Sequence, residues 1–134
     1  MCGNKNHNGR GSICINTFLY NHTASCGSQE LTIHAEISIV PISRQTDTSM
    51  SKAVASAFEA IRKVNGVKAT LTALGTQFEA SSLDDVAAAI KEAHAAARRQ
   101  GAVRVISSIR IDERLDKAQS LEDKVRSVEQ KLKN

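Results

Sequence analysis

Hydroxyl side chains are concentrated in one short stretch of the chain, RQTDTSMS at residues 44–51. Apolar residues at helical spacing follow it, so Ser49 or Ser51 can accept hydrogen bonds from the first free N–H groups of a helix. The same unpaired N–H groups and the positive end of the helix dipole suit an anion, a hydroxyl group or a ring nitrogen. The stretch therefore has two interpretations, an ordinary helix cap and one wall of a ligand site.

Residues that could act in catalysis lack the partners that catalysis needs. His94 has Lys91 and Glu92 nearby in the sequence, but no cysteine or serine nucleophile has a visible base beside it. His34 and His94 are therefore interpreted as structural residues. No Walker or Rossmann glycine pattern is present, which argues against nucleotide binding of those kinds. The missing nucleophile favours a binding protein over an enzyme.

The charge of the chain is nearly balanced. The formal net charge is +4, charged residues make up 24% of 134 residues, and both signs alternate through the expected helices. A nucleic-acid-binding protein usually concentrates its basic residues in one stripe. The length and the hydrophobic content of 41% fit one globular domain. No segment approaches the roughly 20 apolar residues that span a bilayer, so we expect a cytoplasmic protein.

The cysteines are confined to the first thirty residues. Cys2, Cys14 and Cys26 lie twelve residues apart, and with His7 and His22 they lack the close pairs that structural zinc sites use. We therefore expect no metal. Residues 1–30 show no helical or strand period and are predicted to form a flexible extension. Residues 31–134 are predicted to form a single folded domain.

The remaining sequence predicts alternating strands and helices. Ile33 to Ile39 alternate in polarity as a half-buried strand, which Pro41 ends or places at a sheet edge. A helix follows and stops at residues 65–66. Two short strands at about 68–73 and 76–80 form a hairpin through Leu74 and Gly75.

Two capping sequences begin the later helices. Ser82 with Asp85 begins a helix that ends at Gly101, and Ser120 with Asp123 begins another. A last strand at 103–112 lies between them. The order β-α-β-β-α-β with an extra C-terminal helix is the ferredoxin-like α+β arrangement, with an antiparallel sheet and two covering helices. The last helix also carries a narrow apolar seam, suited to docking in a groove of this subunit or a neighbour, at Leu121, Val125, Val128 and Leu132.

One face of the predicted sheet is left open, because right-handed crossovers place both helices on the other face. Its mixed character is typical of self-association or of a ligand surface. Its carboxylates either neutralise the arginines in cross-strand pairs or remain available for an amino group or a cationic ring. The alternation assigns to this face Glu36, Ser38, Thr70, Thr72, Gln77, Glu79, Arg104, Ile106, Ser108 and Arg110.

Several sequence blocks occur together in a recognisable order. They are AEISIVPIS, TSMSKAV, ALGTQFEA, IKEAHAAA and RVISSIRIDERLDKAQSLEDKVRSVEQKL, and they resemble the small thiamine-binding protein family from about Leu31 to Leu132. The resemblance implies binding of thiamine or its hydroxymethylpyrimidine part without chemical turnover and without a cofactor. It also implies sheets packed back to back in dimers that pair into tetramers. The matching positions that could line a site are Glu36, Ser49, Ser51, Gly75, Thr76, Glu79, Ser108 and Arg110.

The resemblance also suggests roles for these positions. The two serines would offer hydroxyl groups, Gly75 would allow close backbone approach, Thr76 would bind a ring nitrogen, and Glu36 or Glu79 would meet an amino group or the thiazolium. Two alternatives remain. A structural homo-oligomer would use the open face for self-association alone. An RNA-binding module would stack bases on strand aromatics, but only Phe78 lies in a strand, and it alternates toward the helices.

Overall fold

The fold has the predicted order of elements. The computed structural model describes residues 32–44 and 49–133, so the predicted extension at residues 1–30 lies outside the described residues. The elements are β1 (Ile33–Ile42), α1 (Ser51–Arg62), β2 (Val67–Leu71), β3 (Thr76–Ala80), α2 (Leu83–Arg99), β4 (Arg104–Glu113) and α3 (Leu121–Leu132). This order confirms the ferredoxin-like α+β class.

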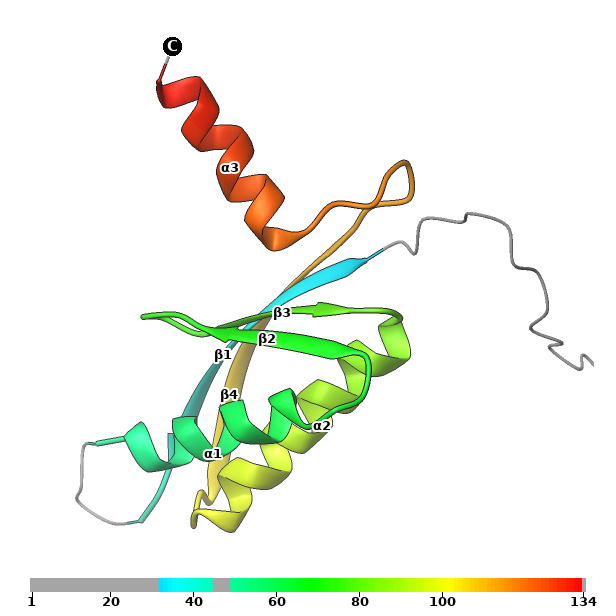
Figure 1. The fold of residues 1–134 in the computed structure, drawn as a ribbon. Coiled ribbons are helices and arrows are strands. Elements are labelled where there is room, and N and C mark those ends of the chain that lie inside the picture. The colour runs from blue at the N-terminus through cyan, green and yellow to red at the C-terminus, as the bar shows by residue number, and fades with distance from the viewer. Residues whose placement is uncertain (1–31, 45–48, 134) are drawn as a thin grey trace, which may run out of the picture.

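The sheet has the strand order β2-β3-β1-β4, and all neighbouring strands are antiparallel. Helices α1 and α2 cover one face, and α3 lies beyond the other (Figure 1). On β1 the side chains of Ile33, Ala35 and Ile37 are buried toward the helices, and Phe78 on β3 is completely buried. Buried alanines of α2 let that helix approach the sheet closely, so a core with few aromatic residues is still well packed.

Helices α2 and α3 begin at the predicted caps. The Asp85 N–H donates to Ser82 Oγ at 3.1 Å, and Ser120 with Asp123 forms a complete capping box. Helix α2 ends before Gly101, whose φ of 89° is favourable for glycine. Helix boundaries that depend on local hydrogen bonding are therefore predictable from the sequence.

Helix α1 differs from its prediction at both ends. Met50 is the N-cap and its side chain makes no capping hydrogen bond, so neither predicted serine occupies the N-cap position. The hydroxyl groups of Ser49 and Ser51 instead lie 3.0 Å apart, within hydrogen-bonding distance of each other. The helix ends at Arg62, before the predicted stop, and Gly66 with φ of 76° directs the chain into β2.

Pro41 lies inside β1 and does not end it. It is opposite Val105 in the pairing with β4, whereas the pairing with β3 stops where Ile37 is opposite Thr76. The Val103 N–H donates to the Ile42 carbonyl at 2.8 Å, on the β4 side of the strand. The backbone of the preceding residue, Pro41, therefore faces the opposite edge of β1. No strand lies there to require the missing N–H of proline, and the prediction of an edge position is right.

The hairpin between β2 and β3 differs from the prediction because β2 ends two residues earlier, at Leu71. Both the backbone N–H and the Oγ1 hydroxyl of Thr72 donate to the Gly75 carbonyl at 2.8 Å, so β2 ends at Leu71. A Cβ atom on Gly75 would lie 2.7 Å from the carbonyl oxygen of Ile37. Glycine is required because the turn passes directly over the backbone of β1.

Candidate functional site

The open face carries a polar row across its centre. Glu36 on β1 is opposite Gln77 on β3 and Arg110 on β4, and Gln77 is opposite Thr70 on β2. Glu36 Oε2 lies 3.4 Å from Arg110 Nη1, which confirms that an ion pair crosses the strands. The Glu36 side chain remains about one-third exposed, so the pair leaves part of the carboxylate accessible.

Helix α3 is attached to the open face through its first turn. The Leu121 N–H donates to Glu79 Oε1 at 2.6 Å, and Glu79 thereby occupies the positive end of the helix. Lys68 donates to Glu122 at 2.8 Å, and Lys124 donates to Asp112. The Lys124 ammonium lowers the pKa of Asp112, the Lys68 ammonium lowers the pKa of Glu122, and Glu122 raises the pKa of Lys68.

The predicted apolar seam of α3 is docked only at its start. Leu121 is half-buried, but Val125, Val128 and Leu132 are 58%, 60% and 81% exposed. The helix extends away from the rest of the molecule (Figure 1). The seam therefore has no groove to fill among the described residues of this subunit.

A cavity of about 150 Å³ lies between the sheet and the first turn of α3. We call it the open-face cavity. Its polar walls combine two carboxylates, a side-chain amide, a guanidinium, an ammonium and an imidazole, and no serine or cysteine is among its described lining residues. It is lined by His34, Ala35, Glu36, Gln77, Arg110 and Asp112 of the sheet and by Leu121 and Lys124 of α3.

His34 is the unusual residue of this cavity. It is only 4% exposed, and neither ring nitrogen has a hydrogen-bond partner among the described residues. The nearest carboxylate oxygen, Glu79 Oε1, is 4.0 Å from Nε2 and already accepts the Leu121 N–H. A buried polar group without a partner costs about 1–3 kcal/mol, so the ring of His34 needs a partner that the described residues do not supply.

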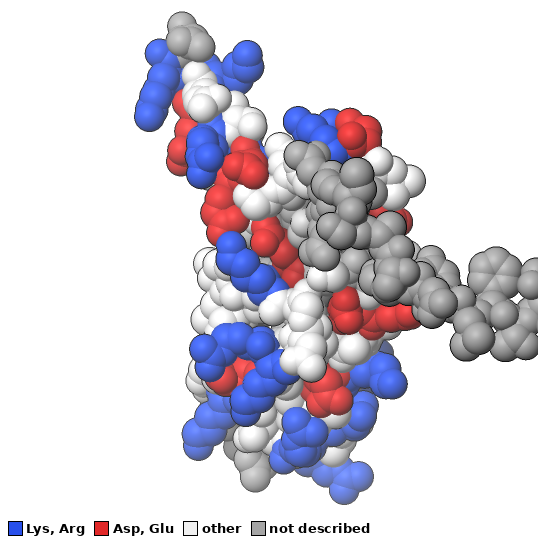
Figure 2. Space-filling model, turned by 45° about the vertical axis from the view of Figure 1, so that its right-hand side comes forward, with Lys and Arg blue, Asp and Glu red and all other residues white. Residues whose placement is uncertain are grey.

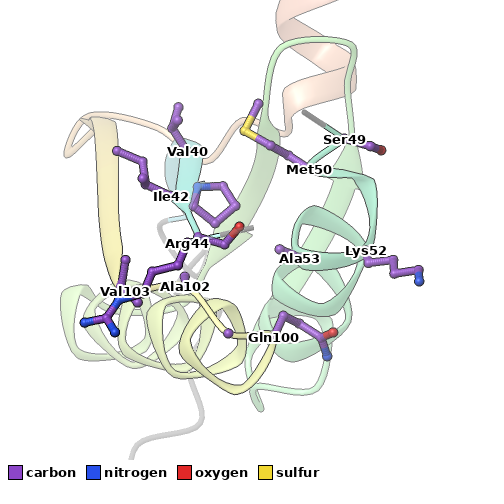
Figure 3. Close-up of a pocket in the computed structure, with 13 residues that line it drawn as sticks. Val40, Ile42, Arg44, Ser49, Met50, Lys52, Ala53, Gln100, Ala102 and Val103 are labelled. Atoms are coloured by element: carbon purple, nitrogen blue, oxygen red, sulfur yellow. The ribbon is translucent and has the colours of Figure 1, made fainter. Parts of the chain in front are cut away.

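A larger cavity of about 540 Å³ lies at the end of the molecule where β1 finishes and α1 begins (Figure 3). We call it the end cavity. Apolar side chains such as Val40, Ile42 and Met50 line it together with Ser49. Its charged lining residues among the described residues, Arg44 and Lys52, are both basic. Figure 2 shows lysine and arginine gathered toward this end of the molecule, so it is unfavourable for a cationic ligand.

The eight predicted site residues fall in three separate places. Glu36 and Arg110 line the open-face cavity, and Glu79 and Ser108 are on the same face outside it. Ser49 lines the end cavity, where it meets Ser51.

Gly75 and Thr76 are placed by packing within the fold. Thr76 is 5% exposed and shares the covered face with Phe78, and Gly75 approaches the β1 backbone. The structure therefore does not bring the eight residues together in one site.

Sequence reasoning missed the roles of His34 and of the first turn of α3. The alternation of β1 places His34 on the same face as Glu36, and this signal could have identified it. Nothing local in the sequence indicates that Lys124 meets Asp112 across the cavity. Within the described ranges, no cluster of three or more His, Cys, Asp or Glu could hold a metal ion. No helix in these ranges is long and apolar enough to cross a membrane.

The fold and the polar open face define a class, the small ferredoxin-like proteins that keep one side of the sheet uncovered by their two crossover helices. Residues 35–129 match the thiamine-binding protein family, and the chain belongs to this family. A UPF0045 protein of Methanothermobacter thermautotrophicus is 40% identical over 100 residues, which cover 75% of this chain and 99% of the relative.

Solved structures show the same fold. A hypothetical protein of Methanocaldococcus jannaschii is 36% identical and superposes with a TM-score of 0.65, covering 74% of this chain and 97% of that one. A Thermotoga maritima protein, provisionally assigned to thiamine biosynthesis or salvage, superposes with a TM-score of 0.58. It is 20% identical, with 72% of this chain and 98% of that chain covered, and this likeness shows the fold alone.

Proposed function

We propose that this protein binds thiamine or its hydroxymethylpyrimidine part without converting it, as a carrier or sensor, and that the open-face cavity is the site. The observation that carries the proposal is the open-face cavity itself. It combines acceptors and donors suited to an aminopyrimidine, and its described lining residues include no serine or cysteine nucleophile. Membership of the thiamine-binding family supports this choice of ligand.

The charges distinguish the two cavities as sites for thiamine. Thiamine carries a permanent positive charge on its thiazolium ring. The open-face cavity has Glu36 and Asp112 in its wall and Glu79 beside it, which offset Arg110 and Lys124. The end cavity has only basic charges among its described lining residues. The electrostatic energy of a thiamine cation bound at the open-face cavity is therefore lower than at the end cavity.

Self-association through the open face completes the proposal. Val40 and Ile106 are opposite each other on this face and are 39% and 43% exposed. With the exposed seam of α3 they offer apolar surface that a second copy would bury. A pair of dimers in a homotetramer would cover this surface in each subunit. A cytoplasmic location and the absence of a cofactor remain predictions.

Calorimetric titration with thiamine, with hydroxymethylpyrimidine and with a short RNA tests the function. We expect saturable binding of both small molecules, and an unchanged ligand NMR spectrum after prolonged incubation because no turnover takes place. Glu36→Gln should weaken binding about tenfold, because a hydrogen bond to a charged group contributes about 1.5 kcal/mol or more. Glu92→Gln, an exposed change on α2, is the matched control.

Other outcomes would select the alternatives. No binding of either small molecule, together with a stable tetramer in size-exclusion chromatography with light scattering, would support a purely structural oligomer. Saturable RNA binding that weakens with salt would contradict the proposal. Ile106→Asp should dissociate the oligomer if the open face is the interface, because it buries a charge there.

A further inference from the structure

The cavity volume limits what the proposed site can enclose. The open-face cavity measures about 150 Å³, and an engineered apolar cavity of about this volume holds one benzene molecule. Thiamine has two rings joined by a methylene group, so only one of them fits beneath the first turn of α3. The second ring must remain outside the cavity.

The polar groups of the cavity select between the two rings. A neutral imidazole offers one N–H donor and one bare nitrogen acceptor, and both nitrogens of His34 are without a partner among the described residues. The thiazolium ring has no N–H group and no free nitrogen lone pair, so it satisfies neither. An aminopyrimidine offers ring nitrogens as acceptors and an amino group as donor.

The neighbours of His34 complement the same ring. Glu36 adds a carboxylate that can accept from the amino group, and Gln77 adds an amide with a donor and an acceptor. Glu79 and Asp112, the carboxylates opposite His34 in the two pairings, are already occupied by the Leu121 N–H and by Lys124. These two carboxylates therefore hold α3 and do not hydrogen-bond the ring nitrogens of His34.

We propose that His34 is a specificity residue of the site and that the open-face cavity encloses a single neutral aminopyrimidine ring, with the rest of the ligand outside it. This inference rests on the proposed function. Hydroxymethylpyrimidine and thiamine then bind with similar affinity. The separate hydroxyethylthiazole half has a ring-nitrogen acceptor but no amino group, so it binds much more weakly. Phosphate groups carried on the thiazole side have little effect, because they lie outside the cavity.

NMR of the full chain labelled with ¹⁵N tests the inference directly. The ring nitrogens of His34 should shift on titration with hydroxymethylpyrimidine, and those of His94, which contacts Ser107 on the other face, should not. His34→Ala should weaken both hydroxymethylpyrimidine and thiamine about tenfold or more in calorimetry. His94→Ala removes the same side chain from α2 and should leave the affinity unchanged.

The possible results distinguish a failure of the proposed function from a failure of the inference about His34. If the wild-type protein binds neither molecule, the proposed function fails. If it binds them but the His34 resonances do not move and His34→Ala binds normally, this inference fails and the proposed function stands. Binding of the thiazole half as tightly as hydroxymethylpyrimidine would also overturn the inference. The resonances are measured on the wild-type chain, so the test does not depend on the folding of a variant.

Discussion

The two histidines that the structure describes lie on opposite faces of the sheet and differ in their surroundings. His94 of α2 reaches the covered face, where its Nε2 is 2.9 Å from the Ser107 hydroxyl. His34 of β1 lies on the open face, is more deeply buried, and has no hydrogen-bond partner among the described residues. The covered face satisfies its own polar groups, whereas the open face leaves one for a molecule outside the fold.

This difference separates stability from function along single strands. Neighbouring residues of β1 and β3 point to opposite faces, so each strand contributes alternately to the core and to the candidate site. The covered face is expected to determine the free energy of unfolding, and the open face the affinity for ligand and for a second copy. Changes at adjacent residues should therefore have different effects.

The largest difference in the free energy of unfolding is expected between Phe78→Ala and Gln77→Ala. Phe78 is completely buried among the core residues, so its truncation should lower the free energy of unfolding by about 3–5 kcal/mol. Gln77→Ala should change it by less than about 1 kcal/mol and should weaken ligand binding. Urea denaturation at fixed protein concentration and calorimetry measure the two quantities. Equal losses of stability would show that the faces do not divide these roles.

Gly75→Ala should also lower the stability of the fold, but by less than Phe78→Ala. The added Cβ would meet the Ile37 carbonyl, and backbone atoms cannot move away as a flexible side chain can. A loss of about 1–3 kcal/mol is expected, as for overpacking elsewhere, with a lower Tm in thermal unfolding. Leu74→Ala in the same turn is the control, because Leu74 is 86% exposed. An unchanged Tm for Gly75→Ala would show that the hairpin can shift away from β1.

Removing the cap of α2 or of α3 should destabilise its own helix by the same amount. The two changes should differ in their effect on the free energy of unfolding of the whole domain. Ser82→Ala and Ser120→Ala each remove a cap worth about 1 kcal/mol. Because α2 packs on the core, the first change should lower global stability. Because α3 is held only by its first turn, the second should increase hydrogen exchange in α3 and leave the urea midpoint unchanged. A matching shift of the urea midpoint in both variants would mean that α3 unfolds together with the domain.

The smallest effect expected is a pH dependence of α3 docking. The pKa values of Asp112 and Glu122 are lowered by their lysine partners, so these pairs stabilise the docked helix above the carboxyl pKa of the undocked state. The contribution is lost as pH falls through the lowered values, below about pH 4. Hydrogen exchange of α3, measured relative to that of α2, should be faster at about pH 3 than at about pH 5. The same relative exchange at both pH values would show that the Leu121 contact with Glu79 is sufficient.

The sequence predicted those features that depend on local spacing. Alternation in β1 and β3 assigned Glu36, Gln77 and Phe78 to their faces, and hydroxyl-to-acid spacing located the starts of α2 and α3. Neither Ser49 nor Ser51 is the N-cap of α1, although serine suits that position. Residue type is necessary for a side-chain cap, but the backbone must also direct the hydroxyl group toward the free N–H groups.

The candidate site was predicted only in part, because it joins distant segments. Glu36 and Arg110 could be paired from the expected strand order, but the roof of the cavity comes from Leu121 and Lys124, far along the chain. The same distance explains why Glu79, expected at a ligand, was found holding the start of α3.

By itself the sequence determined the order of elements, the two faces of the sheet and membership of the thiamine-binding family, because these depend on residue periodicity and on blocks of adjacent residues. Only the tertiary structure decided that β1 continues through Pro41. It also decided that, among residues 32–44 and 49–133, nothing covers the apolar seam of α3 after its first turn and nothing hydrogen-bonds the buried ring of His34. Each of these depends on whether another segment lies beside the residue in space, which no local pattern records.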